Sequence, residues 1–280
     1  MSELALMVYA PITIMLLLGL PHGALDAHIL NSAARNNRQT LGLLIAYVLL
    51  TLATVLFWWA FPTVAVAIFL GLSAIHFGRS DLHNHRTDSL SAGAGAGAGA
   101  GANKYLKVFA HGGIWTVLLP SLQWDQVEPI FKVLDSQTQT LNYLLQGAAL
   151  AWGLCLVVTM FAYIQTREID QVFALFAGAS LAVFAPPLWA LCLYFCLWHA
   201  RRHTSWVLSH FPPKSAALKF MFIFSAIPLA AMLYFALFIP HKLSFDAFVL
   251  QLFFIGIFAL TVPHMLLIDY YLGSKPTVDR

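Results

Sequence analysis

Residues 41–61 read LGLLIAYVLLTLATVLFWWAF, an apolar stretch without one charged side chain. A helix of about 20 such residues crosses the hydrocarbon core of a bilayer. The same composition continues on both sides, because 60% of the 280 residues are hydrophobic and only 10% are charged. Soluble domains carry roughly 25% charged residues, so this chain has too few charges to cover a surface that faces water. We therefore predict an all-α, polytopic bundle of membrane helices.

Further apolar stretches predict about nine transmembrane helices, with eight as the alternative count, in a single domain that covers residues 1–280. Pro62 and the pair Pro186-Pro187 separate closely spaced neighbours. Because proline lacks a backbone N–H and breaks or kinks a helix, a tight hairpin and one kinked helix are both compatible with these positions. The predicted spans are residues 4–21, 41–61, 63–78, 106–122, 141–164, 171–186, 188–203, 217–239 and 247–271.

The basic residues favour nine spans and indicate an orientation. With nine spans, only Lys132 and Lys242 fall on one side of the membrane, and the other 13 of the 15 Lys and Arg residues fall on the opposite side. Lys and Arg concentrate in cytoplasmic loops. We therefore expect a multi-pass protein of the inner (cytoplasmic) cell membrane, with its N-terminus outside and its C-terminus in the cytoplasm. The net charge of +3 gives no indication of nucleic-acid binding.

Two segments between the predicted spans are expected to have no chemical role. Residues 91–102 consist almost entirely of Gly-Ala repeats, which offer no side chains for a core and predict a flexible linker within a cytoplasmic loop. Residues 123–140 mix acidic and apolar side chains, and they predict an interfacial helix on the outer face with Trp124 at headgroup depth.

Six of the 11 histidines fall at the predicted cytoplasmic ends of five different spans. Ionisable residues within membrane helices are costly and usually functional, and neutral imidazole is a good ligand for iron, zinc, copper and nickel. The topology therefore predicts a metal site at one membrane depth, with a proton relay or a structural hydrogen-bond network as alternatives. The six residues are His22, His76, His111, His199, His203 and His264.

The sequence WHARRH at residues 198–203 places His199 and His203 four positions apart. Residues at this spacing share one face of a helix, so the two imidazoles can bind one metal ion, although a helix end that reaches the headgroups has the same pattern. The remaining histidines are expected to be solvated in loops. They are His28, His83, His85, His210 and His241.

Two carboxylates follow predicted metal-binding histidines along the chain. Asp26 lies four residues after His22, and Asp81 lies five residues after His76. Imidazoles that bind metals commonly donate their second N–H to a carboxylate. We expect this role for both aspartates, with an ordinary helix-end or loop position as the alternative for Asp81.

Tyr194 and Trp198 are one turn apart just before the WHARRH histidines, among many other aromatic residues. Most of these aromatics are expected to face lipid or to pack between helices. Tyr194 and Trp198 are the best candidates to line a tunnel for a long, flat, apolar substrate that arrives from the bilayer.

Five short motifs occur along the chain in a characteristic order. They are LPHGALD at residues 20–26, IHFG at 75–78 with Asp81, AHG at 110–112, WHARRH at 198–203 and VPHM at 262–265. Together they resemble the Brp/Blh family of β-carotene dioxygenases. The PHGxxD element is the most specific of them, and the resemblance extends from the first span to the last. The Gly/Ala repeat departs from what the family implies.

The resemblance implies a function and a set of site residues. Enzymes of this family cleave the central 15,15′ double bond of β-carotene with O2 at a non-haem Fe2+, and the two all-trans-retinal molecules formed supply microbial rhodopsins with their chromophore. Retinal biosynthesis in the membrane is therefore expected. The resemblance implies His264 as a further candidate ligand and His111 as a residue that supports the ligands or positions substrate. The implied iron-binding and catalytic residues are His22, His76, His199 and His203.

Two rival functions stay open on the residues alone. One is a different histidine-ligated membrane metalloenzyme that acts on another apolar lipid. The other is a binding or transport protein with a histidine-lined path, which would need polar residues through the whole membrane thickness rather than at one end. The chain has no HExxH motif of zinc proteases. It also has no lysine in the middle of a span, which excludes an opsin.

Overall fold

The computed structural model describes residues 5–83, 98–240 and 242–273, and the secondary structure of these residues is helical, without β-strands. Apolar side chains such as Leu150, Phe173 and Phe222 are exposed on the helices, as lipid contact requires. The predicted all-α membrane fold is confirmed. Six helical segments among the described residues are long and apolar enough to span a membrane: Leu6–Ala33, Asn37–Ala60, Pro62–Leu82, Thr138–Thr166, Lys214–Phe238 and Phe245–Asp269.

The other three predicted spans also lie in helices, but these are shorter or interrupted. Residues 171–186 fall in the short apolar helix α10 (Ile169–Phe184). The other two spans contain π-helical turns, labelled η, which are rare and often occur at functional sites. Their elements are α6 (Ala98–Gly113), η4 (Ile114–Leu118), α7 (Leu119–Leu122), α11 (Pro187–Leu193), η5 (Tyr194–Ala200) and α12 (Arg201–His210).

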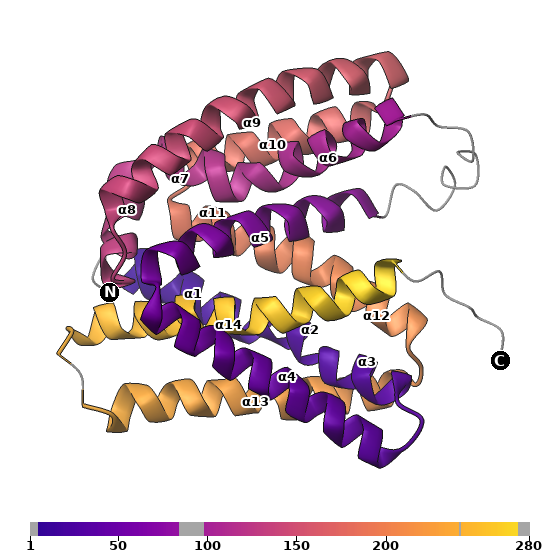
Figure 1. The fold of residues 1–280 in the computed structure, drawn as a ribbon, viewed down its shortest axis with the longest axis vertical. Coiled ribbons are helices and arrows are strands. Elements are labelled where there is room, and N and C mark those ends of the chain that lie inside the picture. Colours follow the sequence, from indigo (N-terminus) through magenta and orange to yellow (C-terminus); the bar gives the residue numbers. More distant parts are fainter. Residues whose placement is uncertain (1–4, 84–97, 241, 274–280) are drawn as a thin grey trace. The chain divides into compact units, whose positions relative to one another are not determined.

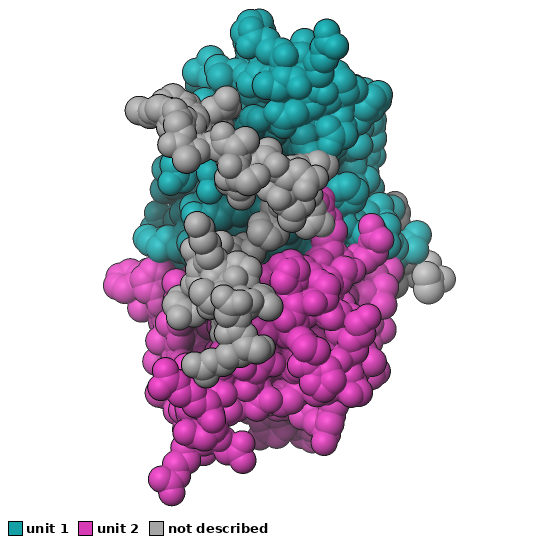
Figure 2. All heavy atoms as spheres, turned by 90° about the vertical axis from the view of Figure 1, so that its right-hand side faces the viewer, with its two compact units in different colours: residues 1–11, 63–199 teal, residues 12–62, 200–280 magenta. Residues whose placement is uncertain are grey.

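The chain folds into two compact units, which Figure 2 distinguishes by colour. Unit 1 comprises residues 1–11 and 63–199, and unit 2 comprises residues 12–62 and 200–280. Of the predicted Gly/Ala linker, residues 91–97 lie outside the described residues, and α6 begins at Ala98.

In unit 1, α6 packs along α9, and α10 packs beside α9 (Figure 1). The core between these helices contains the buried residues Trp115, Trp152, Tyr163 and Leu175. Residues 124–133 form a helix, as expected for the interfacial segment. Unit 1 also contains η1 (Ala5–Tyr9), α5 (Pro62–His83), α8 (Trp124–Val133) and α9 (Thr138–Thr166).

Two glycines allow α5 and α6 to approach closely. A Cβ atom on Gly78 would collide with the backbone carbonyl of Val108, and one on Gly112 would collide with the backbone carbonyl of Ala74. Small residues permit such contacts between membrane helices. Because both glycines adjoin motif histidines or lie within two residues of them, this contact also sets where those histidines lie.

We expect Gly112→Ala to destabilise unit 1 by about 1–3 kcal/mol or more, because the added methyl group meets backbone that cannot rotate away. The measurement is the melting temperature of the purified protein in detergent. Gly71→Ala in α5 is the matched control, since nothing lies within 4 Å of its Cβ position. That variant should be neutral or slightly more stable, because alanine is the better helix former. Equal melting temperatures for the two variants would contradict the close approach.

In unit 2, α4 packs against α14, and α13 packs against α2 and α3 (Figure 1). Trp58 and Phe258 meet in the α4–α14 contact with their ring centroids 5.3 Å apart. The Asn36 side chain accepts a hydrogen bond from the backbone N–H of Gln39, which caps α4. The elements are α1 (Ala10–Ile14), η2 (Met15–Gly19), α2 (Leu20–Ala24), α3 (Asp26–Ala33), α4 (Asn37–Ala60), α12, α13 (Lys214–Phe238) and α14 (Phe245–Gly273).

Candidate metal centre

The PHGALD motif begins where the π-helical turn η2 passes into α2. Pro21 lies in the first turn of α2, directly after η2, and it cannot donate a backbone hydrogen bond to that preceding turn. The ring of His22 is buried, and its Nδ1 donates a hydrogen bond to the carbonyl of Gly19 in the preceding turn. This hydrogen bond sets the orientation of the imidazole and leaves Nε2 as its acceptor nitrogen.

Three buried imidazoles of unit 2 converge from three different helices. His22 comes from α2, His203 from α12 and His264 from α14. The ring centroids of His22 lie 5.3 Å from His203 and 5.4 Å from His264, and those of His203 and His264 lie 5.0 Å apart. Ligand atoms of Asp26, His203 and His264 all lie within 4.8 Å of one another, a grouping that could hold a metal ion.

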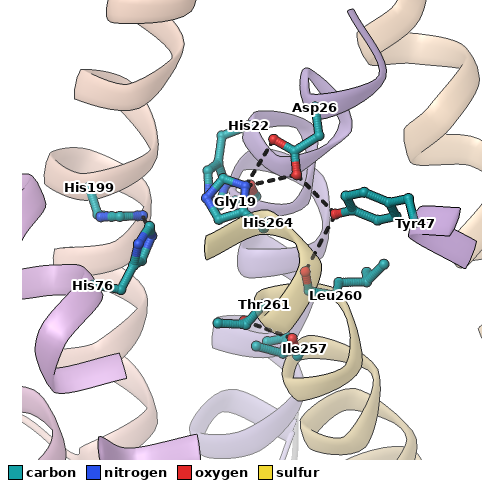
Figure 3. A network of polar contacts seen from close by, with 10 residues as sticks. All are labelled: Gly19, His22, Asp26, Tyr47, His76, His199, Ile257, Leu260, Thr261 and His264. Carbon is teal, nitrogen blue, oxygen red and sulfur yellow. Dashed lines mark hydrogen bonds and ion pairs between the residues drawn. The ribbon is translucent and has the colours of Figure 1, made fainter. Parts of the chain in front are cut away.

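Asp26 is the carboxylate of this cluster, and it pairs with His264 (Figure 3). Nδ1 of His264 lies 2.9 Å from both carboxylate oxygens, and the Tyr47 hydroxyl donates to Oδ2 at 2.9 Å. The same hydroxyl lies 3.4 Å from the backbone oxygen of Leu260 in α14. An imidazole whose Nδ1–H points at a carboxylate keeps its Nε2 lone pair for a metal.

This arrangement extends what the sequence indicates. Sequence proximity suggested His22 as the partner of Asp26, whereas the hydrogen bond described here joins Asp26 to His264, which lies 238 positions further along the chain. Tyr47 was not among the predicted site residues. Its only signal is a phenol hydroxyl in an uncharged span that also contains Thr51 and Thr54.

In unit 1, His76 of α5 and His199 of η5 face one another (Figure 3). Both are buried, and their Nε2 atoms lie 3.2 Å apart. Imidazole nitrogens bind a metal such as zinc at about 2.0–2.1 Å, so two that share one ion are separated by roughly 3.0–3.4 Å. The spacing of this pair therefore fits two ligands of one cation.

Asp81 lies one and a half turns after His76 on α5 and is also buried. It accepts hydrogen bonds from the Tyr194 hydroxyl at 3.1 Å and from Nε1 of Trp198 at 3.0 Å. Tyr194 further stacks on Trp115, with centroids 4.1 Å apart. The two residues predicted to line a substrate tunnel, Tyr194 and Trp198, thus both donate hydrogen bonds to Asp81. Asp81 itself was expected to support a metal-binding histidine.

His111 lies on α6 of unit 1, in a polar cluster with Tyr163, Lys107 and Glu168. Its Nε2 lies 3.0 Å from the hydroxyl of Tyr163, and both residues are buried. Nζ of Lys107 lies 4.4 Å above the Tyr163 ring and 3.0 Å from a carboxylate oxygen of Glu168. The roles expected for His111, in supporting ligands or in positioning substrate, stay predictions.

One expectation for the loop histidines is wrong. His210 is exposed at the end of α12, as expected, but His28 is only 1% exposed. The first helical segment continues past the predicted end of its span to Ala33, and α3 packs against α13, so His28 faces inward. Its Nε2 donates to the carbonyl of Phe211 at 2.8 Å. The side chains of the other three lie outside the described residues: His83, His85 and His241.

We expect His28→Ala to lower the free energy of unfolding by about 1–3 kcal/mol, because it leaves a buried carbonyl without its donor. The melting temperature of the purified protein measures this loss. The iron content per folded molecule should not change, since His28 bonds to a loop carbonyl rather than to the cluster of His22, His203 and His264. A melting temperature equal to that of the His210→Ala control would contradict the buried hydrogen bond.

Both histidine clusters have the donor chemistry of a first-row transition-metal site. Imidazole nitrogens suit iron. His22, His203 and His264 supply three buried imidazoles, and the buried Asp26 carboxylate accepts from Nδ1–H of His264, as carboxylates that support metal-binding imidazoles do. The residues described here therefore fit a non-haem iron.

Comparisons with known proteins cover nearly the whole chain. A family model described as beta-carotene 15,15′-dioxygenase matches residues 13–271. A protein named beta-carotene 15,15′-dioxygenase, from uncultured marine bacterium 66A03, is 34% identical over 278 residues, which cover 95% of this chain and 94% of that protein. No solved structure matches significantly. Because the family model covers most of the chain and the relative covers 95% of it, the chain belongs to the β-carotene 15,15′-dioxygenase family.

Proposed function

We propose that this protein is a membrane enzyme that cleaves the central 15,15′ double bond of β-carotene with O2 and releases two all-trans-retinal molecules. Family membership supports the substrate and the bond. The observation that carries the metal part of the proposal is the convergence of three buried imidazoles from α2, α12 and α14 beside one buried carboxylate. Buried, converging imidazoles are costly without a ligand or hydrogen-bond partners.

We propose Fe2+ as the cofactor. The candidate ligands in unit 2 are His22, His203 and His264, and the candidate ligands in unit 1 are His76 and His199. When bound, the iron supplies the one-electron chemistry that the spin-forbidden reaction of O2 with a closed-shell polyene needs. Both oxygen atoms of O2 appear in the two aldehyde products, so the overall reaction needs no external reductant.

The chain's own residues orient these ligands and keep water away. Asp26 holds the His264 ring in one orientation by accepting from its Nδ1–H, and the Tyr47 hydroxyl in turn donates to Asp26. In unit 1, Phe77 lies against both Tyr194 and His199, with ring centroids 5.2 Å and 5.1 Å away. β-Carotene has no polar group for the protein to bind, so apolar shape must position its central bond. Tyr194 and Trp198 remain the proposed tunnel residues.

The distribution of basic residues supports placement in the inner membrane, with the N-terminus outside and the C-terminus in the cytoplasm. Retinal released there would be available to a microbial rhodopsin.

Expression in a bacterium that accumulates β-carotene tests the function directly. Cells with the intact chain should lose their orange colour and yield extractable retinal, and cells with the empty vector should do neither. If the folded, iron-loaded protein leaves the carotene unchanged, the substrate assignment is wrong. If retinal is replaced by longer apocarotenoids, the position of the cleaved bond is wrong.

A further inference from the structure

Asp81 joins α5 to the π-helical segment η5 within unit 1. Its two carboxylate oxygens accept from Tyr194 and from Trp198, the first and fifth residues of η5. His199 follows Trp198 directly, and His76 lies five residues before Asp81 on α5. Helix α5 and segment η5 are therefore in contact at two places, at the Asp81 carboxylate and at the pair of imidazoles of His76 and His199.

A π-helical turn is less regular than an α-helix and persists where packing or function maintains it. Here Tyr194 is held on both sides, since its ring stacks on Trp115 and its hydroxyl reaches Asp81. The ring of His199 in turn lies parallel to that of Phe195, with centroids 5.6 Å apart and an interplanar angle of 12°. If η5 relaxed into regular α-helix, its side chains would rotate about the axis, and Nε2 of His199 would leave Nε2 of His76.

We propose that Asp81 is a positioning residue, which holds η5 against α5 so that His76 and His199 keep the spacing of two ligands on one cation. The proposal rests on the proposed function only in treating these two histidines as metal ligands. Asp81 acts through Tyr194 and Trp198 on the position of His199, and these two aromatics have a structural task besides any contact with substrate.

The chemistry of the three side chains explains why a carboxylate occupies this position. The Trp198 indole can only donate, and the Tyr194 hydroxyl donates here. A carboxylate presents acceptors in both directions, whereas an asparagine amide would present an N–H₂ group to one of the two donors. Asp81→Asn therefore keeps the volume but removes the charge, and its N–H₂ group faces the Tyr194 hydroxyl, which can then no longer make its charge-assisted hydrogen bond to a carboxylate.

Cobalt binding tests the proposal without carotenoid or turnover. The purified, metal-free full-length chain in detergent is titrated with Co2+, and the visible absorption of the bound ion is recorded. Asp81→Asn should bind Co2+ about tenfold more weakly, as loss of outer hydrogen bonds typically does, and its spectrum at saturation should be altered. Asp125→Asn, which removes an exposed carboxylate from α8 in the same unit, should match wild type.

A double-mutant cycle separates positioning from general destabilisation. In the His76→Ala background the pair is already broken, so Asp81→Asn should cause little further loss of Co2+ affinity. An equal further loss in that background, or a wild-type affinity and spectrum for Asp81→Asn alone, would overturn the proposal. Tyr194→Phe gives a second, milder test, because it removes one hydrogen bond and keeps the stacked ring; it should shift the saturated Co2+ spectrum in the same direction.

The same titration distinguishes failure of this inference from failure of the proposed function. A wild-type chain that binds Co2+ but cleaves no carotenoid leaves the role of Asp81 intact and contradicts the reaction. A wild-type chain that binds no Co2+ contradicts the metal centre and overturns the role of Asp81 with it.

Discussion

Replacing His203 by alanine should lower the rate of retinal formation by about a thousandfold or more and remove bound iron. His203 is buried in the cluster of unit 2 and contacts the rings of both His22 and His264. A metal ion in an active site supplies several kcal/mol of transition-state stabilisation, and about 4 kcal/mol corresponds to a factor of roughly a thousand. Iron per purified molecule and retinal from detergent-solubilised enzyme are the two measurements.

The matched control for this variant is His210→Ala. His210 lies on the same helix, α12, but is exposed at its end. It should keep both iron and activity, because its hydrogen bonds to described residues go to Trp206 and Ser209, within the last helical turn. Full iron occupancy in folded His203→Ala protein would show that His203 is not a ligand.

Replacing Asp26 by alanine should weaken iron binding by about 10- to 100-fold, the usual effect of losing the partner that orients a metal-binding imidazole. The variant removes the acceptor of His264 Nδ1–H and the acceptor of the Tyr47 hydroxyl together. The His264 ring can then rotate, and its Nε2 no longer has one fixed direction. Competition for iron with a chelator of known affinity measures the change, and retinal formation should fall in parallel at limiting iron.

Tyr47→Phe is the graded comparison for Asp26. It removes one hydrogen bond to the carboxylate and leaves the bond between Asp26 and His264 in place, so iron binding should weaken less than in Asp26→Ala. If the two variants have the same affinity for iron, Asp26 does not act through His264. If Asp26→Ala binds iron as tightly as wild type, the carboxylate contributes only to folding.

The helices and their breaks follow from local properties of the chain. Charge-free stretches of sufficient length predict membrane helices wherever they fold. Pro62 and Pro187 each begin a new helix, at the places where the sequence separates closely spaced spans. Helix length and helix breaks depend on residues only a few positions apart, so the sequence predicts them without knowledge of tertiary contacts.

Sequence analysis also predicted which residue types form the candidate site. Histidines at the ends of five predicted spans, together with five short motifs, indicated the family before any distance was known, and the family comparison agrees. The sequence likewise singled out Asp26, Asp81 and Tyr194 as residues with chemical or packing roles. The sequence did not show which of these residues bond to one another.

Partnerships between distant residues were decided by tertiary structure alone. Asp26 bonds to His264, Asp81 bonds to Tyr194 and Trp198, and His28 is buried against the carbonyl of Phe211. Sequence spacing favoured nearer partners for the first two and a solvated loop for the third. A helix brings residues three and four apart together, but a hydrogen bond between helices depends on the rotation of each helix and on which helix packs beside it. Composition and spacing therefore determined the membrane fold and the set of histidines, and the packing of helices within each unit determined which polar groups meet.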